Sequence, residues 1–236
     1  KAQFLLDRLE RRLSPEAPRT LLDYGAGGGG LMLHARARGW KVQGFEPGRR
    51  GRETCRDLGL DVVANCDELP AGGFGLVTLH HVFEHLADPA SVLRGIKRLL
   101  HPLGRLFIEV PNAGSLRARL ALPIVSRHLG VDERYRAFPI PLMYYTDRAL
   151  RGMLRKGGWD IDATFTIGFG VDEFFTSSRR VPPSGTARAR SDSPSERKRV
   201  RHMIRDAFLS TGLGENLAAI ARPPADHGTT ARSEII

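Results

Sequence analysis

Apolar side chains between residues 20 and 110 alternate between two patterns, short buried runs that suit strands and a helical spacing of three and four positions. Strands separated by helices in this way are typical of a parallel sheet with helices on both faces. A short amphipathic helix over 4–13 precedes the first strand. The predicted strands are 20–24, 40–45, 61–64, 74–80 and 105–110, and the predicted helices between them are 31–38, 49–58 and 89–100.

The pattern changes after Pro111. Residues 112–145 hold scattered apolar groups and several prolines without a sustained period, which indicates a cap or lid. A helix over 147–156 follows. Residues 159–167 then alternate apolar and polar side chains, which predicts an edge strand of antiparallel type with one wet face. A last strand is predicted over 215–222.

Composition limits the classes of protein that this chain can belong to. The 236 residues and 41% apolar content suit one full-sized core. The two cysteines, Cys55 and Cys66, have no metal-ligand spacing, so we expect neither a disulfide framework nor a zinc site, and no metal. No apolar run reaches the roughly 20 residues that cross a bilayer, so we expect a cytoplasmic protein.

The net charge of +10 raises the possibility of an anionic partner. Much of the excess falls in 168–214, a Ser-, Pro- and Arg-rich insertion predicted to be flexible. Within it, residues 197–209 place apolar side chains on one helical face and Lys and Arg elsewhere, which suits peripheral contact with an anionic membrane. Packing of that helix on the rest of the chain is the default alternative.

A glycine-rich loop follows the first predicted strand and precedes the first helix after it. Gly25, Gly27 and Gly30 fit G-x-G-x-x-G, a spacing shared by several nucleotide-binding folds. Glycine lets the backbone approach a ligand closely, and the loop amides can bind an anion. That anion is a pyrophosphate in dinucleotide enzymes or a methionine carboxylate in methyltransferases, so the loop alone leaves both open.

Two acidic residues narrow the choice. Asp23, two residues before Gly25, completes D-x-G-x-G-x-G, which resembles motif I of class I S-adenosylmethionine-dependent methyltransferases. Dinucleotide folds usually have an apolar residue there. Glu46, at the end of the second strand, is placed where a carboxylate can accept both ribose hydroxyls. Glu46 therefore supports an adenosine cofactor without choosing between the two families.

Residues 74–112 resemble the small-molecule branch of that methyltransferase family, which includes ubiquinone-type O-methyltransferases. The likeness lies in a phenylalanine-led fourth strand, a Glu-His pair, Asp-Pro, a helix, a turn and a fifth strand ending near Pro-Asn. It implies a Rossmann-like doubly wound α/β fold with a mostly parallel seven-stranded sheet, an antiparallel last strand and a cap insertion. It also implies S-adenosyl-L-methionine as cofactor. The cofactor-binding residues that it implies are Asp23, Gly25, Ala26, Gly27, Glu46, Pro47, Asn65, Cys66, Asp67 and His80.

The expected organisation is a single domain with appendages, and two positions depart from the family pattern. Asn65 stands where an acidic residue near the adenine is typical, with Asp67 as a nearby substitute, and Gly75 replaces an Asp that commonly follows Phe74. The expected segments are an N-terminal helix over 1–19, a methyltransferase domain over 20–167 with 215–223, the 112–145 cap, the 168–214 insertion and a 224–236 tail.

Histidines at the end of the fourth strand are the candidates for chemistry. His85, and after it His81, can accept a proton from a hydroxyl acceptor near neutral pH, although a histidine there often only caps or packs. Glu84 is expected to be structural. Tyr144 and Tyr145 either line the acceptor pocket or belong to the core.

The residues favour methylation of a small molecule, with oxygen as the expected acceptor atom. A nucleic-acid substrate is disfavoured, because no Asn/Asp-Pro-Pro-aromatic tetrad ends the fourth strand: His80 to Phe83 stands in its place. Neither cysteine follows a proline, as the nucleophile of cytosine-5 methyltransferases does. Phosphate attraction alone is not specific. The alternatives left open are an NAD-dependent oxidoreductase and a non-catalytic S-adenosylmethionine-binding module.

Overall fold

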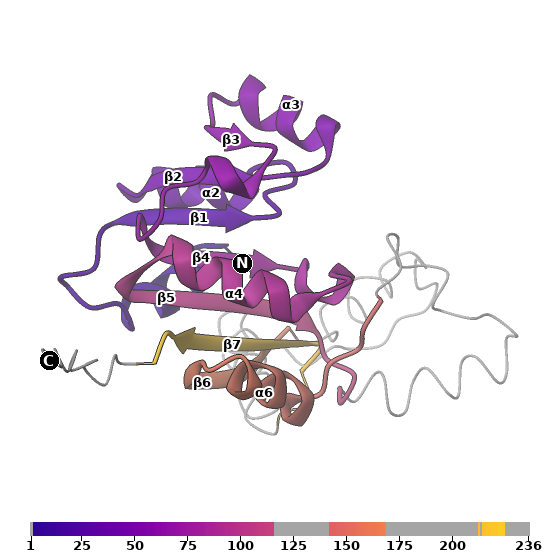
Figure 1. Ribbon diagram of the computed structural model, residues 1–236. Helices are drawn as coiled ribbons and strands as arrows, with labels where there is room; N and C mark the ends of the chain where they lie inside the picture. The colour runs from indigo at the N-terminus through magenta and orange to yellow at the C-terminus, as the bar shows by residue number, and fades with distance from the viewer. Residues whose placement is uncertain (1, 116–141, 169–211, 213, 225–236) are drawn as a thin grey trace, which may run out of the picture.

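The computed structural model describes residues 2–115, 142–168, 212 and 214–224 (Figure 1). Its elements lie close to the ranges that the sequence predicts, and β1, β4 and α6 match them at both ends. The helices are α1 (Ala2–Glu10), α2 (Gly30–Arg36), α3 (Arg49–Asp57), α4 (Pro89–Leu99) and α6 (Asp147–Lys156), with short 3-10 helices η1 (Cys66–Glu68) and η2 (Phe83–His85). The strands are β1 (Thr20–Tyr24), β2 (Lys41–Phe45), β3 (Val62–Val63), β4 (Phe74–His80), β5 (Leu100–Pro111), β6 (Asp160–Ile167) and β7 (Asn216–Arg222).

These strands form one seven-stranded sheet in the order β3-β2-β1-β4-β5-β7-β6. Strands β1 to β5 pair in parallel, and β7 is antiparallel to both β5 and β6. The predicted fold class is therefore confirmed. The expected edge strand is β6, and its antiparallel partner β7 is the strand that runs against the others (Figure 1).

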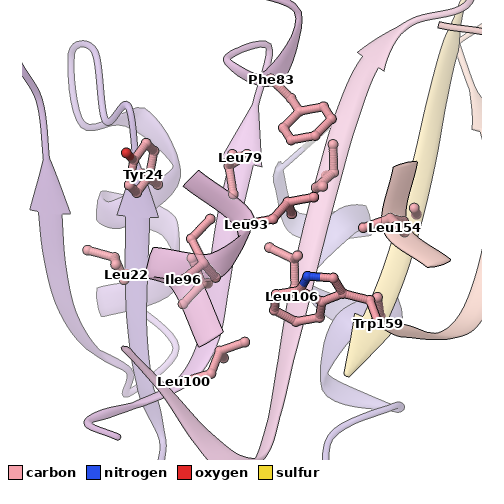
Figure 2. Close-up of a cluster of buried hydrophobic side chains, with 14 of the residues drawn as sticks. Leu22, Tyr24, Leu79, Phe83, Leu93, Ile96, Leu100, Leu106, Leu154 and Trp159 are labelled. Carbon is pink, nitrogen blue, oxygen red and sulfur yellow. The ribbon is translucent and has the colours of Figure 1, made fainter. Parts of the chain in front are cut away.

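Helices cover both faces of the sheet. On one face, α4 and α6 pack on strand residues such as Leu22 and Leu106, and Trp159 closes the cluster (Figure 2). On the other face, Leu5, Leu6 and Leu9 of α1 join α2 over Leu21 and its neighbours. Successive strand residues point to opposite faces of the sheet. Leu22 therefore packs under α4 and α6, and Leu21 packs under α1 and α2.

The start of β5 differs from the sequence-based expectation. The strand begins at Leu100, although the sequence predicts a helix up to residue 100, then a turn, and a strand only from residue 105. In the pairing with β4, Leu100 lies opposite Phe74 and Arg105 opposite Leu76, so the intervening residues form an irregularity in the ladder. The turn residues are therefore accommodated inside the strand. Leu100 is buried in the same apolar cluster as the α4 residues Leu93 and Ile96. Such tertiary packing favours the earlier start of the strand and is not visible in the strand propensities of single residues.

Three predicted segments lie mostly or wholly outside the described residues. They are the cap, the insertion with its basic helix over 197–209, and the tail. Among the helices of the described part, none is both long and apolar enough to cross a membrane.

The order of the strands determines where a ligand can bind. The chain moves outward from β1 to β3, then crosses to the other side of β1 to form β4 and β5. Ligands of open α/β sheets bind at such a switch point, beyond the carboxyl ends of the strands. The residues that follow β1, β2, β4 and β5 therefore form the candidate site.

Candidate functional site

Asp23 lies near the carboxyl end of β1 and is 4% exposed. In the neighbouring strand β4, Thr78 is its register partner, and the Thr78 Oγ1 donates a 2.9 Å hydrogen bond to the Asp23 carboxylate. Burial raises the pKa of Asp23 to about 7, the Thr78 hydrogen bond opposes this rise, and the Glu46 carboxylate adds to it. Asp23 is thus held at the base of the glycine loop.

The glycine loop is fastened to the end of β2. The amides of Gly25 and Ala26 donate to the Phe45 carbonyl at 2.7 and 3.0 Å. Gly25 has a φ of +85°, and a Cβ there would lie 2.4 Å from Val82 Cγ2, so only glycine fits. Gly27 also has a positive φ, +52°, but a Cβ there would meet nothing within 4 Å. The loop backbone is therefore open to approach at Gly27.

Glu46 follows β2 and links the glycine loop to the next turn. Its Oε2 accepts from the Gly27 amide at 2.8 Å, and its Oε1 accepts from the Gly48 amide at 2.7 Å. Arg52 donates to the carbonyls of Glu46 and Pro47 at 2.9 and 2.6 Å, which fixes the backbone on either side of the carboxylate. An ionised carboxylate has about four acceptor sites, so two remain for a ligand.

Asn65, Cys66 and Asp67 follow β3, at the same edge of the sheet as Glu46. The Asn65 Oδ1 accepts from the Asp67 amide at 3.1 Å and caps η1. The Cys66 side chain interacts with the Tyr24 hydroxyl, and burial raises the pKa of both groups. The structure thus brings all three residues to the site, with the Asn65 carboxamide oxygen already used in the cap.

The histidines after β4 gather around two buried carboxylates. Glu84 is 2% exposed, and its Oε1 lies 3.5 Å from His81 Nδ1 and 3.9 Å from His85 Nε2. Glu109 in β5 is fully buried, 3.4 Å from His80 Nε2 and 3.6 Å from His81 Nε2. Among the described residues His81 is the one non-glycine residue with a positive φ, +56°. Such backbone strain is often found at functional sites.

Sequence reasoning missed Glu109, Thr78 and Asn216. Glu109 interrupts the apolar run from Leu106 to Val110 of β5, and a charged residue within such a run was the available signal. The Asn216 Nδ2 donates to Glu109 Oε1 at 2.7 Å from β7. Thr78 and Asn216 gave no signal, because a single polar residue in a strand has no distinguishing pattern.

The two tyrosines after the cap have different environments. Tyr145 is buried against Phe83, with ring centroids 5.3 Å apart, and belongs to the core. Tyr144 is 55% exposed in the described part of the chain. Of the two interpretations left open by the sequence, the core one holds for Tyr145.

A cleft of about 280 Å³ opens beside His80 on the side of the sheet covered by α1 and α2. Its wall is mainly apolar. The lining residues are Ala2, Leu5, Gly30, Leu31, His34 and His80.

Comparison with known proteins agrees with this geometry. The profile of the methyltransferase domain family matches residues 1–164. A ubiquinone biosynthesis O-methyltransferase of Pseudomonas paraeruginosa is 35% identical over 107 residues, which are 41% of this chain and 46% of that protein. The chain thus spans about half the length of the curated relatives it matches.

Solved structures show the same fold at low identity. A SAM-dependent methyltransferase from Archaeoglobus fulgidus has a TM-score of 0.59 at 19% identity, covering 94% of each chain. The [4+2]-cyclase SpnF has a TM-score of 0.56 at 18% identity, covering 94% of this chain and 80% of its own. The fold therefore does not by itself define the reaction. The family match over more than half of the chain, together with the glycine loop and the fold, establishes that the chain belongs to the class I S-adenosylmethionine-dependent methyltransferase family.

Proposed function

We propose that this chain transfers the methyl group of S-adenosylmethionine to a hydroxyl oxygen of a small-molecule acceptor. The observation that carries the proposal is the contact between His85 and the buried carboxylate of Glu84 at the carboxyl end of β4. An imidazole that has a carboxylate near one of its nitrogens is suited to accept a proton from a hydroxyl group at the other nitrogen. The O-methyltransferase relatives, matched over part of their length, support the same acceptor chemistry.

The residues present fit the cofactor. Gly27 has an open backbone where a Cβ would meet nothing within 4 Å, and Glu46 is held next to it with acceptor sites remaining. In the proposed complex the Gly25–Gly27 loop and Asp23 hold the methionine portion, and Glu46 with Pro47 holds the ribose. Asn65, Cys66 and Asp67 contact the adenine.

S-adenosylmethionine supplies a methyl group that is already activated on a sulfonium. The protein therefore has to orient the acceptor, exclude water and take up the hydroxyl proton. His85 is the proposed base: its Nε2 faces Glu84, and its Nδ1 makes no ion pair among the described residues, which leaves Nδ1 to receive the proton. Both nitrogens of His81 face carboxylates, so His81 is the second choice for this role.

The acceptor is proposed to lie between this cluster and the 112–145 cap. A nucleic-acid substrate is disfavoured, because the Asn/Asp-Pro-Pro-aromatic tetrad is absent after β4, where His80 to Phe83 stands. Contact of the 197–209 helix with an anionic membrane is part of the proposal only for a lipid-soluble acceptor.

Calorimetry with S-adenosylhomocysteine and with NAD tests the cofactor. We expect the homocysteine compound to bind and NAD not to bind, and binding of NAD alone would contradict the proposal. Methyl transfer from labelled S-adenosylmethionine to a panel of phenols and alcohols tests the reaction. If S-adenosylhomocysteine binds but no methyl group is transferred to any acceptor, a non-catalytic binding module would be favoured.

The role of His85 is tested with His85→Ala and a matched control. His101→Ala removes a histidine whose Nδ1 accepts from the Leu103 amide at 3.2 Å in β5, away from the cluster. We expect His85→Ala to retain S-adenosylhomocysteine affinity and lose about 10²–10⁴-fold in turnover, the usual contribution of a general base. His101→Ala is expected to retain both. Unchanged turnover in His85→Ala would remove His85 as the base.

A further inference from the structure

Helix α3 packs against the glycine loop of the candidate site. The Thr54 methyl carbon would lie 3.8 Å from a Cβ at Gly28. Cys55 Sγ would lie 3.2 Å from a Cβ at Gly29. Gly51 precedes these two α3 residues by three and four positions. Positions with that spacing share one side of a helix, so Gly51, Thr54 and Cys55 face the loop together.

At Gly51 the helix backbone comes too close to its neighbours for a side chain. A Cβ there would lie 2.8 Å from Glu46 Cγ and 2.9 Å from the Gly27 carbonyl oxygen. Alanine is normally favoured over glycine inside a helix, so helix propensity gives no reason for this glycine. The close approach of the backbone does give one. Because one of the opposing atoms belongs to the backbone, rotation of the Glu46 side chain alone cannot relieve the overlap.

Both polar backbone groups of Gly27 are hydrogen-bonded within the protein. Its amide donates to Glu46 Oε2 at 2.8 Å, and its carbonyl accepts from the Cys55 thiol at 3.4 Å. Burial raises the pKa of Cys55, and the carboxylates of Glu46 and Asp23 raise it further, so the sulfur keeps the hydrogen that it donates. The Gly27 peptide is therefore held on its amide side by Glu46 and on its carbonyl side by α3.

The same contacts confine the Glu46 carboxylate. Its two oxygens accept from the Gly27 and Gly48 amides, and its Cγ lies next to the Gly51 backbone. Groups that bind a ligand have to be held within about 0.5 Å of the productive geometry by the residues that support them. In the proposed complex Glu46 holds the ribose and the Gly27 loop holds the methionine portion. The packing of α3 therefore determines how far apart these two parts of the site lie.

We propose that Gly51 and Cys55 are positioning residues for cofactor binding, which hold the Glu46 carboxylate and the Gly27 peptide at the separation that S-adenosylmethionine requires. Both act through other residues. Gly51 leaves room for the Glu46 side chain, and Cys55 bonds the Gly27 carbonyl. This inference rests on the proposed function, from which it takes the roles of Glu46 and Gly27. It adds that cofactor affinity depends on α3, a helix that supplies none of the proposed cofactor-binding residues.

Gly51→Ala tests the close approach. We expect S-adenosylhomocysteine affinity, measured by calorimetry well below the melting temperature, to fall at least about 10-fold, because the added methyl group displaces Glu46 or α3. Gly152→Ala is the matched control. Gly152 lies in α6, is partly buried as Gly51 is, and a Cβ there would meet no atom of the described residues within 4 Å. Equal affinities of the two variants would overturn the role of Gly51.

Cys55→Ser and Cys55→Ala separate the hydrogen bond from packing. Serine keeps a donor for the Gly27 carbonyl, but it places a hydroxyl in the apolar cluster around Leu60, which costs stability. Alanine removes the donor and leaves the cluster apolar. We expect Cys55→Ser to bind S-adenosylhomocysteine at least about threefold more tightly than Cys55→Ala, although it melts at a lower temperature.

A merely structural role of Cys55 predicts the reverse order, with the less stable Cys55→Ser as the weaker binder. Either that order or equal affinities of the two variants would overturn the role of Cys55. The Cys55 variants decide the proposal if Gly51→Ala does not fold.

Glu46→Gln, measured alongside, distinguishes this inference from the proposed function. If Glu46→Gln weakens S-adenosylhomocysteine binding while Gly51→Ala and Cys55→Ala leave it unchanged, the positioning role is wrong and the proposed function stands. If Glu46→Gln leaves the affinity unchanged, the proposed placement of the cofactor is wrong and the role of α3 fails with it. Failure of the unaltered chain to bind S-adenosylhomocysteine would count against the proposed function itself.

Discussion

The Thr78 hydroxyl and the Asp23 carboxylate are joined by a 2.9 Å hydrogen bond between the two central strands of the sheet. Thr78 is fully buried and Asp23 is nearly so. The pair lies directly beneath the glycine loop. Because a buried charge is unfavourable, the site contains a carboxyl group that resists ionisation, with its pKa raised to about 7.

This raised pKa predicts a decline in stability with pH. The unfolded chain releases the Asp23 proton near its ordinary pKa of 3.8, whereas the folded chain keeps it until about pH 7. Between these values the folded state holds more protons, so the free energy of unfolding falls as pH rises and levels off above pH 7. Asp23→Asn has no such loss. As pH rises from 4 to 8, the free energy of unfolding of this variant is therefore expected to gain on the order of 2–4 kcal/mol relative to that of the unaltered chain.

Urea denaturation without cofactor, at several pH values, measures that difference. Thr78→Val serves as the companion variant: it removes a hydrogen bond that lowers the pKa of Asp23, so the decline should extend to higher pH. A stability difference between Asp23→Asn and the unaltered chain that is the same at every pH would show that Asp23 does not titrate in this range.

Glu46 is expected to control cofactor affinity. Both of its oxygens accept backbone amides, from Gly27 and Gly48, and hydrogen bonds to a charged group contribute about 1.5–3 kcal/mol each. Glu46→Gln places an NH₂ group against one of those amides and removes the charge. Calorimetry should show S-adenosylhomocysteine affinity reduced about 10- to 100-fold.

The matched control for Glu46 is Glu53→Gln. Glu53 lies in α3, is exposed, and pairs with Arg49 at 2.7 Å one helical turn away. An exposed pair of this kind contributes little, so affinity should change less than about twofold. Equal effects of the two substitutions would mean that Glu46 acts only through the net charge of the region.

Gly27 should matter more for binding than for folding. Its φ of +52° makes Ala strained by about 1–2 kcal/mol, but a Cβ there meets no neighbouring atom. The methyl group of Gly27→Ala would instead project into the space where the cofactor is proposed to lie. We expect at least about 10-fold weaker S-adenosylhomocysteine binding, equivalent to 1.4 kcal/mol.

Gly72→Ala separates backbone strain from ligand contact. Gly72 has a φ of +64°, also meets nothing within 4 Å, and lies before β4 at the other end of the sheet. Both variants should lose similar stability, and only Gly27→Ala should lose affinity. If Gly72→Ala weakened binding as much, general destabilisation would explain both results.

The local sequence was informative wherever one element determined its own boundaries. Pro89 at the first position of α4, with Asp88 accepting from the Ser91 amide, is a start signal that reads directly from the residues. Asp147–Lys156 was equally clear, with Thr146 as its cap. The glycine loop and Asp23 belong to the same class, because the motif lies within a few consecutive residues.

The histidine cluster could be predicted only in part, for a physical reason. His81, Glu84 and His85 are close in sequence, but Glu109 reaches them through a parallel pairing that forms only in the folded sheet. Asn65 was expected near the adenine, and its use as the cap of η1 depends on a local turn that its residue type alone did not specify.

Gly75 shows why one departure from the family pattern is required by this fold. A Cβ at Gly75 would lie 1.9 Å from the Pro18 carbonyl oxygen, and the Gly75 amide donates to Thr20 Oγ1 at 3.0 Å. The segment before β1 therefore lies directly on the start of β4. The Asp that the family resemblance leads one to expect after Phe74 has no room here.

Gly75→Ala is therefore expected to lower the free energy of unfolding by about 3 kcal/mol or more. The opposing atom belongs to the backbone, and the Thr20 hydroxyl holds the two segments together through the Gly73 carbonyl and the Gly75 amide. Gly95→Ala in α4 is the matched control: a Cβ there meets nothing within 4 Å, and alanine is favoured over glycine in a helix by up to about 1 kcal/mol. Urea denaturation should thus show opposite signs for two identical chemical changes. A Gly75→Ala variant as stable as the unaltered chain would mean that the segment around Pro18 can move away from β4 without cost.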